Sequence, residues 1–290
     1  MIRSLSRLAP LTVLLHTAIL SNSLQAAEPA LSAKPLWELG VGGGVLLQPQ
    51  YPASDEYQTR GLGLPFVVYR GDILRIGDGG AARAVALENE KVELSLSFAA
   101  AFDADSEGNT LRENMPDLDF IFEVGPQLVI DLRERDFGDG QRSNLQLALQ
   151  TRAAFSTDFG ALEHQGYVFE PMLRYRHEGA WHPQFEATVA LKPLWATRDV
   201  HGYFYDVTPE FSNATRPAFR AHGGYFGTGL NFSGTWRFNR QARMFVTLQT
   251  SYRQGAENVG SPLFANRFNA GFGVGFLWMF RESETTVMRP

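Results

Sequence analysis

The last regular segment of the chain, Phe268–Phe280, alternates between large apolar residues and residues that are mostly small or polar. The apolar positions are Phe268, Ala270, Phe272, Val274, Phe276, Trp278 and Phe280. A period of two predicts a β-strand with one apolar face. At about 3.3 Å per residue the segment would extend about 43 Å, whereas a tilted strand of about 9–11 residues already crosses the hydrocarbon core of a bilayer. We therefore expect a membrane-crossing strand whose aromatic face meets lipid.

The same alternation recurs along the chain and predicts twelve strands, of which two are short and weakly patterned. The expected strands are Trp37–Leu47, Leu62–Val68, Leu74–Ile76, Val85–Leu87, Val92–Phe102, Leu118–Leu132, Leu145–Arg152, Tyr167–Arg176, Gln184–Trp195, Phe226–Phe238, Met244–Arg253 and Phe268–Phe280. Such a series predicts an all-β chain forming one antiparallel up-and-down transmembrane barrel, in which the last strand closes against the first. If the short link Asp78–Gly80 is not a turn, the count falls to ten.

The connections alternate in length. Tight turns are expected at Arg70–Asp72, Glu88–Glu90, Glu178–Ala180 and Asn239–Arg240, with a longer one at Arg133–Asn144. Loops rich in turn-forming residues are expected at Gln48–Arg60, Asp103–Asp117, Ser156–Gly166, Thr197–Arg220 and Gln254–Asn266. Short turns on one side and long loops on the other are typical of outer-membrane barrels, whose long loops face outward. Whether Thr197–Arg220 folds outward or into the barrel stays open at this level.

Composition excludes several other classes of protein. The 290 residues include no Cys, which excludes disulfides and thiolate metal sites, and the net charge of −5 argues against general nucleic-acid binding. A mean hydropathy of −0.18 is too polar for a bundle of membrane helices. A soluble β-sandwich would also alternate, but its strands would be shorter and its polar face would carry most of the charges.

The N-terminus has the pattern of a secretory signal. Arg3 and Arg7 precede the apolar stretch Leu8–Leu20, and Leu24-Gln25-Ala26 supplies a small-residue cleavage site. A membrane-anchor helix is the alternative, but the apolar stretch is short for one. The expected organisation is a signal peptide at 1–26, a flexible lead-in at 27–36, the barrel at 37–280 and a tail at 281–290.

No catalytic, cofactor-binding or metal-binding residue is predicted. The histidines after the signal are His164, His177, His182, His201 and His222, and none has the spacing of a metal site. No Ser lies in a Gly-x-Ser-x-Gly elbow. His222 and Ser233 fall on one expected strand, too far apart for a hydrogen bond. We expect these histidines in loops or near the membrane interfaces, and we expect no enzyme.

Charged residues on the polar strand faces should converge on the barrel interior. They are Glu123, Asp131, Arg152, Glu170, Arg174, Arg176, Glu186, Lys192, Arg237 and Arg253. They could make an ion-selective pore, or they could pair with one another and fill a narrow lumen. Mutual pairing is the favoured interpretation.

Several loop and turn segments resemble a known family. They are Pro49–Asp55, followed by Leu64–Tyr69, and then Tyr203–Glu210, Arg216–Phe219 and Ala221–Tyr225. These segments are similar to those of the MltA-interacting protein family, also called MipA or OmpV-like, of Gram-negative outer membranes, over roughly Trp37 to Phe280. Two positions differ from the family pattern. Ala53 stands where the family has Gly, and ten residues follow Phe280, where family members usually end on an aromatic residue.

The resemblance implies a non-enzymatic outer-membrane protein. The name-giving member is a scaffold that brings a lytic murein transglycosylase together with a murein synthase, and others are linked to adhesion, stress response or antibiotic entry. The leading hypothesis is thus a murein-enzyme scaffold embedded in outer-membrane lipid, with periplasmic turns such as Arg133–Asn144 as its contact surface. A small-solute channel, and more remotely a lipid-modifying enzyme, remain alternatives.

Overall fold

The computed structural model describes residues 32–72, 74–76, 83–89, 91–101, 103–104, 106 and 108–289. The expected signal peptide and the Asp78–Gly80 link lie outside these ranges. The described strands are β1 (Ser32–Pro35), β2 (Trp37–Pro49), β3 (Tyr57–Arg70), β4 (Leu74–Ile76), β5 (Arg83–Glu88), β6 (Val92–Ala101), β7 (Phe120–Gly138), β8 (Gln141–Thr157), β9 (Leu162–Glu178), β10 (Phe185–Ala196), β11 (Gly224–Arg237), β12 (Ala242–Tyr252), β13 (Phe268–Glu282) and β14 (Thr286–Arg289). Two short helices, α1 (Arg198–Tyr205) and η1 (Pro209–Phe211), separate β10 from β11.

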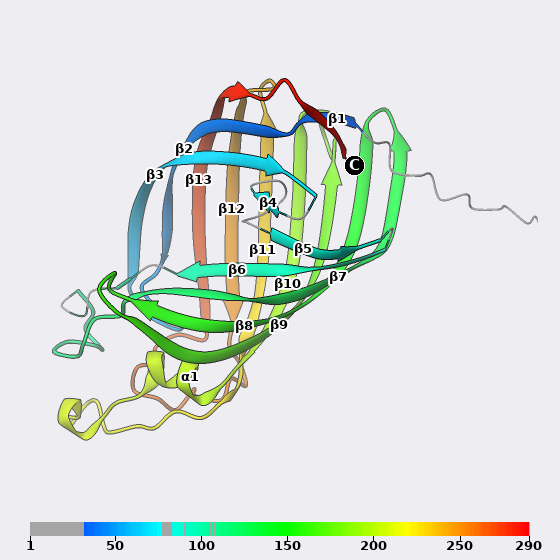
Figure 1. Ribbon diagram of the computed structural model, residues 1–290. Coiled ribbons are helices and arrows are strands. Elements are labelled where there is room, and N and C mark those ends of the chain that lie inside the picture. Colours follow the sequence, from blue (N-terminus) through cyan, green and yellow to red (C-terminus); the bar gives the residue numbers. More distant parts are fainter. Residues whose placement is uncertain are drawn as a thin grey trace, which may run out of the picture.

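Twelve of the described strands, β2 to β13, close into one antiparallel barrel (Figure 1). Each pairs with its neighbours in sequence, and β13 closes against β2 with Phe272 opposite Leu47 and Trp278 opposite Val41. This confirms the predicted up-and-down barrel and its seam. The strands of the wall are shortest at β4 and β5. The described pairing between β3 and β4 is limited to Tyr69–Ile76 and Arg70–Arg75.

The two faces of β13 differ as the alternation predicts. Phe272, Phe276, Trp278 and Phe280 are each about half exposed on the outside of the barrel, whereas Asn269, on the other face, is buried. Large side chains exposed in this way occur on nearly every strand of the wall. A continuous belt of apolar and aromatic side chains on a closed barrel is the surface that a bilayer requires. No helix among the described residues is long and apolar enough to cross a membrane.

Two predicted loops are instead continuations of strands. β7 and β8 remain paired as far as Gly138 and Gln141, so Arg133–Asn144 is a tight hairpin tip rather than a long turn. Likewise β8 and β9 pair as far as Thr157 and Leu162, which leaves only residues 158–161 of the expected Ser156–Gly166 loop. Alternation underestimates β7, β8 and β9 because a strand beyond the bilayer needs no apolar face, and polar residues extend it through backbone hydrogen bonds alone.

The ends of the chain also differ from expectation. Ser32–Pro35, expected to be part of a flexible lead-in, forms β1 and pairs antiparallel with β14 in the tail. β13 itself continues to Glu282, beyond the aromatic residue at which we expected the barrel to end. Glu38 lies beside this two-stranded ribbon and is buried against Arg70, with Nη2–Oε1 at 2.5 Å. Arg70 Nη1 also donates to the carbonyl of Pro35 (2.7 Å), so the ribbon is tied to the barrel rim.

Candidate functional site

The long loops pack together across one end of the barrel, on the side opposite the β1–β14 ribbon (Figure 1). We call residues 50–56, 108–119, 197–223 and 253–267 together the plug. Its helix α1 buries Val200, His201, Phe204 and Tyr205. The spacing of these positions, two adjacent residues repeated four later, places them on one side of a helix. This answers the open question about Thr197–Arg220, because its helix packs inward against the barrel end.

The plug shares a hydrophobic core with the adjoining strand ends of the barrel, made from segments far apart in sequence. Tyr205 is 1% exposed and Leu263 is fully buried, and both belong to a cluster that also contains Tyr51 and Phe226. The ring of Tyr205 lies 5.7 Å from the rings of both Phe226 and Phe264. Aromatic contacts of this kind add to the free energy of burial. The plug is therefore a packed part of the fold rather than a set of independent surface loops.

Hydroxyl groups within the plug join its loops to one another. Tyr51 Oη donates to the carbonyl of Leu263 (2.8 Å), and Tyr205 Oη donates to that of Pro52 (3.1 Å). Ser261 Oγ in turn donates to the carbonyl of Tyr205 (2.8 Å). Burial raises the pKa of Tyr205 to about 12, so its hydroxyl remains a donor at physiological pH. These bonds connect three loops that share no sequence neighbours.

A buried histidine lies at the centre of a second hydrogen-bond network. His201 is 1% exposed, and its Nε2 faces the carbonyl of Gly224 at 3.1 Å. Nε2 must therefore carry the proton, and Nδ1 accepts from Asn258 Nδ2 at 2.8 Å. Asn258 also donates to the carbonyl of His222 and accepts from its backbone N–H. Burial lowers the pKa of His201, so the ring is neutral at physiological pH.

Ala53 occupies a strained backbone position in the plug. Its φ angle is +70°, in the left-handed region that favours glycine. The conformation persists because Ala53 N–H donates to Asn269 Oδ1 (3.0 Å) and its carbonyl accepts from the backbone of Ala265 and Asn266. Glycine adopts this conformation without strain, which explains why the family resemblance predicts Gly at this position.

The inward charges predicted from the sequence fall into three groups. Arg152 lies 2.8 Å from Glu123 and 3.5 Å from Glu170, and Arg176 lies 3.5 Å from Glu186. Other charged side chains form hydrogen bonds with neutral partners. Asp131 accepts from Asn144 and Gln146, and Arg174 donates to Gln146. Lys192, Arg237 and Arg253 have no carboxylate within ion-pair distance among the described residues. Mutual pairing therefore accounts for part of the set.

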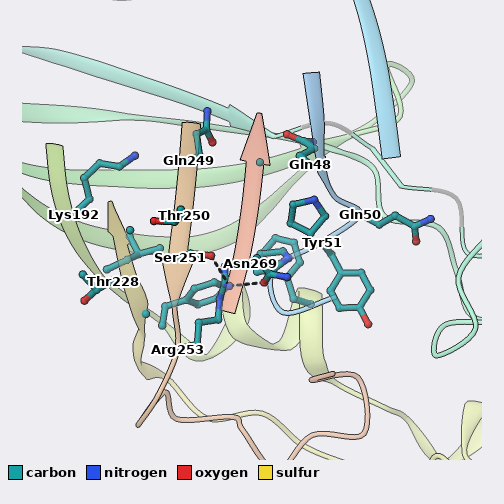
Figure 2. A pocket seen from close by; sticks show the side chains of 18 of the residues that line it. Gln48, Gln50, Tyr51, Lys192, Thr228, Gln249, Thr250, Ser251, Arg253 and Asn269 are labelled. Carbon is teal, nitrogen blue, oxygen red and sulfur yellow. Dashed lines mark hydrogen bonds between the residues drawn. The ribbon is translucent and has the colours of Figure 1, made fainter. Parts of the chain in front are cut away.

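Beneath the plug lies a half-open cavity of about 290 Å³ (Figure 2). Figure 2 shows Lys192 on the β10 side, Gln48 and Tyr51 on the β2 side, and Arg253 at the end of β12. Hydroxyl and amide side chains make up much of the remaining wall, and Tyr203, Phe204 and Phe226 contribute aromatic surface. The lining contains two acids, Asp119 and Glu170.

Two expectations about individual residues are wrong. Phe226, expected on the lipid-facing side, is 5% exposed and packs 4.8 Å from the ring of His201. A register shift beside Leu194 and Trp195 opens the pairing of β10 with β11, and this irregularity turns Phe226 inward. His222 lies before β11 and not on the strand with Ser233, because β11 begins at Gly224.

The remaining histidines lie near strand ends or in turns, and within the described ranges no three His, Asp or Glu side chains could hold a metal ion. Sequence reasoning missed the plug itself, including Tyr205, Asn258 and Leu263. A signal was present, because Tyr203-Phe204-Tyr205 and Leu263-Phe264 are apolar runs inside polar loops. Such runs have no reason to persist in loops that only meet water.

Comparison with known families decides the relationship. The family model described as "MltA-interacting protein MipA" matches residues 41–280. The chain belongs to this family. The match covers nearly the whole barrel and the plug, and together with the lipid-facing belt it makes the chain a MipA-family outer-membrane β-barrel. No curated protein matches the chain significantly.

Solved structures with a related outline share little sequence with this MipA-family chain. An outer membrane channel from Pseudomonas putida F1 is 13% identical, with a TM-score of 0.44, over 87% of this chain and 98% of its own. The NanC porin is 9% identical, with a TM-score of 0.39, over 83% and 100%. Outer membrane phospholipase A from Escherichia coli is 9% identical, with a TM-score of 0.31, over 85% and 94%.

Proposed function

We propose that this MipA-family barrel is a non-enzymatic scaffold that holds a lytic murein transglycosylase and a murein synthase at the inner face of the outer membrane. Family membership supports an interaction role, since the family is described by its partner. The observation that carries the proposal is the exposed tip of the β7–β8 hairpin. It lies at the end opposite the plug, and by the rule that short turns face the periplasm this end meets the cell wall.

The hairpin tip, residues 132–144, has the composition of a contact surface. Arg133, Glu134, Arg135 and Asp136 are exposed in succession, and exposed Phe137 follows them. Phe137 is 52% exposed and stacks on His177, with ring centroids 5.4 Å apart. An aromatic anchor surrounded by charges of both signs is the usual make-up of a binding hot spot and its rim. Figure 1 shows the tip of the β7–β8 hairpin, drawn in green, on the same side of the barrel as the β1–β14 ribbon.

The plug supports a scaffold over the alternative of an open diffusion channel. Its core residues are buried to a few per cent, as in the interior of a soluble domain, and they pack across the outer end. An open pore would instead line this end with hydrated side chains. The same packing supports a non-enzymatic role, because the hydrogen bonds of buried His201 go to Asn258 and the carbonyl of Gly224.

The hairpin proposal is tested with two exposed phenylalanines at opposite ends of the barrel. Phe137→Ala changes the inner tip, and Phe159→Ala changes the turn at residues 158–161 on the plug side, where Phe159 is 86% exposed. With purified murein transglycosylase and synthase immobilised, we expect Phe137→Ala to weaken retention of the barrel about tenfold and Phe159→Ala to leave it unchanged. Equal retention of both variants would remove the hairpin from the interface, and no retention of the unaltered barrel would end the scaffold proposal.

We also propose that the chain reaches the outer membrane through cleavage of a signal peptide after Ala26. Arg3 and Arg7, the apolar stretch Leu8–Leu20 and the small residues before Ala27 support this. Mass spectrometry of the protein from an outer-membrane fraction should give a chain that begins at Ala27. An intact N-terminus there would mean that this segment is retained as an anchor.

A further inference from the structure

The cavity beneath the plug contains two cations that the fold leaves without acidic partners. Arg253 is 7% exposed and donates through Nη1 to Ser251 Oγ and Asn269 Oδ1, both at 2.7 Å. Both partners are neutral, and its Nε is buried with no hydrogen-bond partner among the described residues. A buried guanidinium without a carboxylate is costly, since the desolvation of the charge is not offset by an opposite charge.

Lys192 is the second cation of the cavity. It lies on the inward face of β10, opposite Gly229 of β11, and is partly buried. Within the described part of the chain its ammonium group has neither an ion pair nor a hydrogen bond. In Figure 2 its side chain extends from β10 toward the hollow.

The acids of the lining do not neutralise these cations. Glu170 lies 3.5 Å from Arg152, which it shares with Glu123. Asp119 lies at the plug side of the cavity, where its backbone carbonyl accepts from Tyr203 Oη at 3.0 Å. Burial raises the pKa of its carboxyl group, and several acidic neighbours raise this pKa further. Lys192 and Arg253 are therefore the groups able to attract a negative charge into the hollow.

The rest of the lining suits a ligand rich in hydroxyl groups. The amide side chains of Gln48, Asn231 and Gln249 form no hydrogen bonds within the described part of the chain. Each amide can both donate and accept, as a sugar hydroxyl can. Aromatic rings from Tyr203 and Phe226 add apolar surface on the plug side. Pockets with apolar walls and a few converging polar groups are the usual form of small-molecule sites.

We propose that this cavity binds a small organic anion with a hydroxyl-rich body, the shared chemistry of a sugar carboxylate and a sugar phosphate. Lys192 and Arg253 hold the oxyanion, and the amides of Gln48, Asn231 and Gln249 bond the hydroxyl groups. The hollow of about 290 Å³ is close to the smallest volumes typical of ligand pockets, which favours a single sugar unit over a longer chain.

Calorimetry on the barrel in an uncharged polyether detergent tests the proposal with four probes: glucuronate, glucose 1-phosphate, glucose and inorganic phosphate. We expect one or both charged sugars to bind, with the Kd at least about tenfold lower than for glucose or for inorganic phosphate. Glucuronate alone would identify a carboxylate site, and glucose 1-phosphate alone a phosphate site. The proposal fails if neither charged sugar binds at about 10 mM, or if glucose or inorganic phosphate binds as tightly as they do.

Variants then locate the binding. Lys192→Gln should weaken the charged sugar about tenfold, and it removes no hydrogen bond or ion pair from the described structure. Arg237→Gln, at the opposite end of β11, is the matched control and should leave the Kd unchanged. Gln249→Ala should weaken the charged sugars while leaving the Kd for inorganic phosphate unaltered. Unchanged binding in both Lys192→Gln and Gln249→Ala would place the ligand elsewhere and overturn the proposal.

Discussion

The outer end of the barrel buries its connecting segments, whereas the inner end leaves its hairpin tips in water. At the outer end, Tyr205, Leu263 and His201 are nearly or wholly buried and belong to loops far apart in sequence. At the inner end, Phe137 at the tip of the β7–β8 hairpin is 52% exposed, and Trp181 in the turn after β9 is 81% exposed. The same twelve strands support both ends, so the difference comes from the side chains of the connections. A packed end resists opening, and an exposed end is available to partners.

The two ends also differ in how their polar groups are satisfied. The plug combines long-range hydrogen bonds between neutral groups, as between Asn258 and His201, with buried Arg216, which donates to the carbonyls of Leu111 and Glu113. The inner rim uses charges, with Glu38 buried between Arg70 (2.5 Å) and Arg243 (3.8 Å). Because the plug network contains a buried histidine, His201, we expect the plug to respond to mild acid.

The largest effect is expected from removing the aromatic centre of the plug. Tyr205→Ala leaves a cavity among Phe226, Phe264 and Leu263 and should destabilise the plug by about 3–5 kcal/mol. Because the barrel wall keeps its own hydrogen bonds, we expect proteolysis within residues 197–223 and ion conductance in planar bilayers. We expect the unaltered protein to show neither. Heat-modifiable migration on gels should persist.

Phe159→Ala, at an exposed turn of the same end, is the control for Tyr205→Ala and should stay closed and resistant to protease. If Tyr205→Ala also remains closed, the loops at this end do not depend on their shared core. The contrast between a packed outer end and an open inner end would then be wrong.

A smaller effect is expected from acid acting on His201. Burial lowers its pKa in the folded protein below the ordinary value of about 6.5, while Glu257 and the carbonyl of Gly224 oppose that shift. The unfolded plug therefore binds the proton more readily than the folded one. Its stability is fully present above pH about 6.5, and is lost progressively as pH falls from there toward the lower folded value.

The measurement is the rate of proteolysis within residues 197–223, relative to an unfolded reference peptide at each pH. The rate should rise between pH 7 and pH 5 in the unaltered protein and stay flat in His201→Asn. His182→Asn, at an exposed turn of the inner end, should keep the pH dependence. A pH dependence that survives His201→Asn would assign it to another group.

The smallest effect is expected from relieving strain at Ala53. Glycine has no penalty at a φ of +70°, so Ala53→Gly should stabilise the plug by about 1 kcal/mol. Slower proteolysis of residues 197–223 near the midpoint of denaturation would show it. Ala196→Gly is the control, because this buried alanine lies in β10 and glycine should destabilise it. Faster proteolysis of Ala53→Gly would mean that packing of the alanine methyl group outweighs the strain.

Much of the barrel wall was predictable from sequence because every second residue of a membrane-crossing strand faces lipid and has to be apolar. Phe272 and Trp278 had to face outward, and Asn269 inward, for β13 to cross a bilayer at all. The rule fails outside the bilayer, and so the ends of β7, β8 and β9 were misplaced. It also fails at Phe226, where a local break in register reverses the side of the strand without any change in the residue pattern.

The alternation of residues, by itself, determined that this chain forms a membrane barrel, which strand closes it and which residues point inward. The tertiary structure decided that the outer end is plugged, that the tail pairs with the lead-in, and that Lys192 and Arg253 share a cavity. The physical reason is the range of the interactions. Strand alternation is local and repeats every two residues, whereas contacts such as Tyr51 with Leu263 or Ala53 with Asn269 join residues more than 200 positions apart. No local pattern encodes contacts of that range.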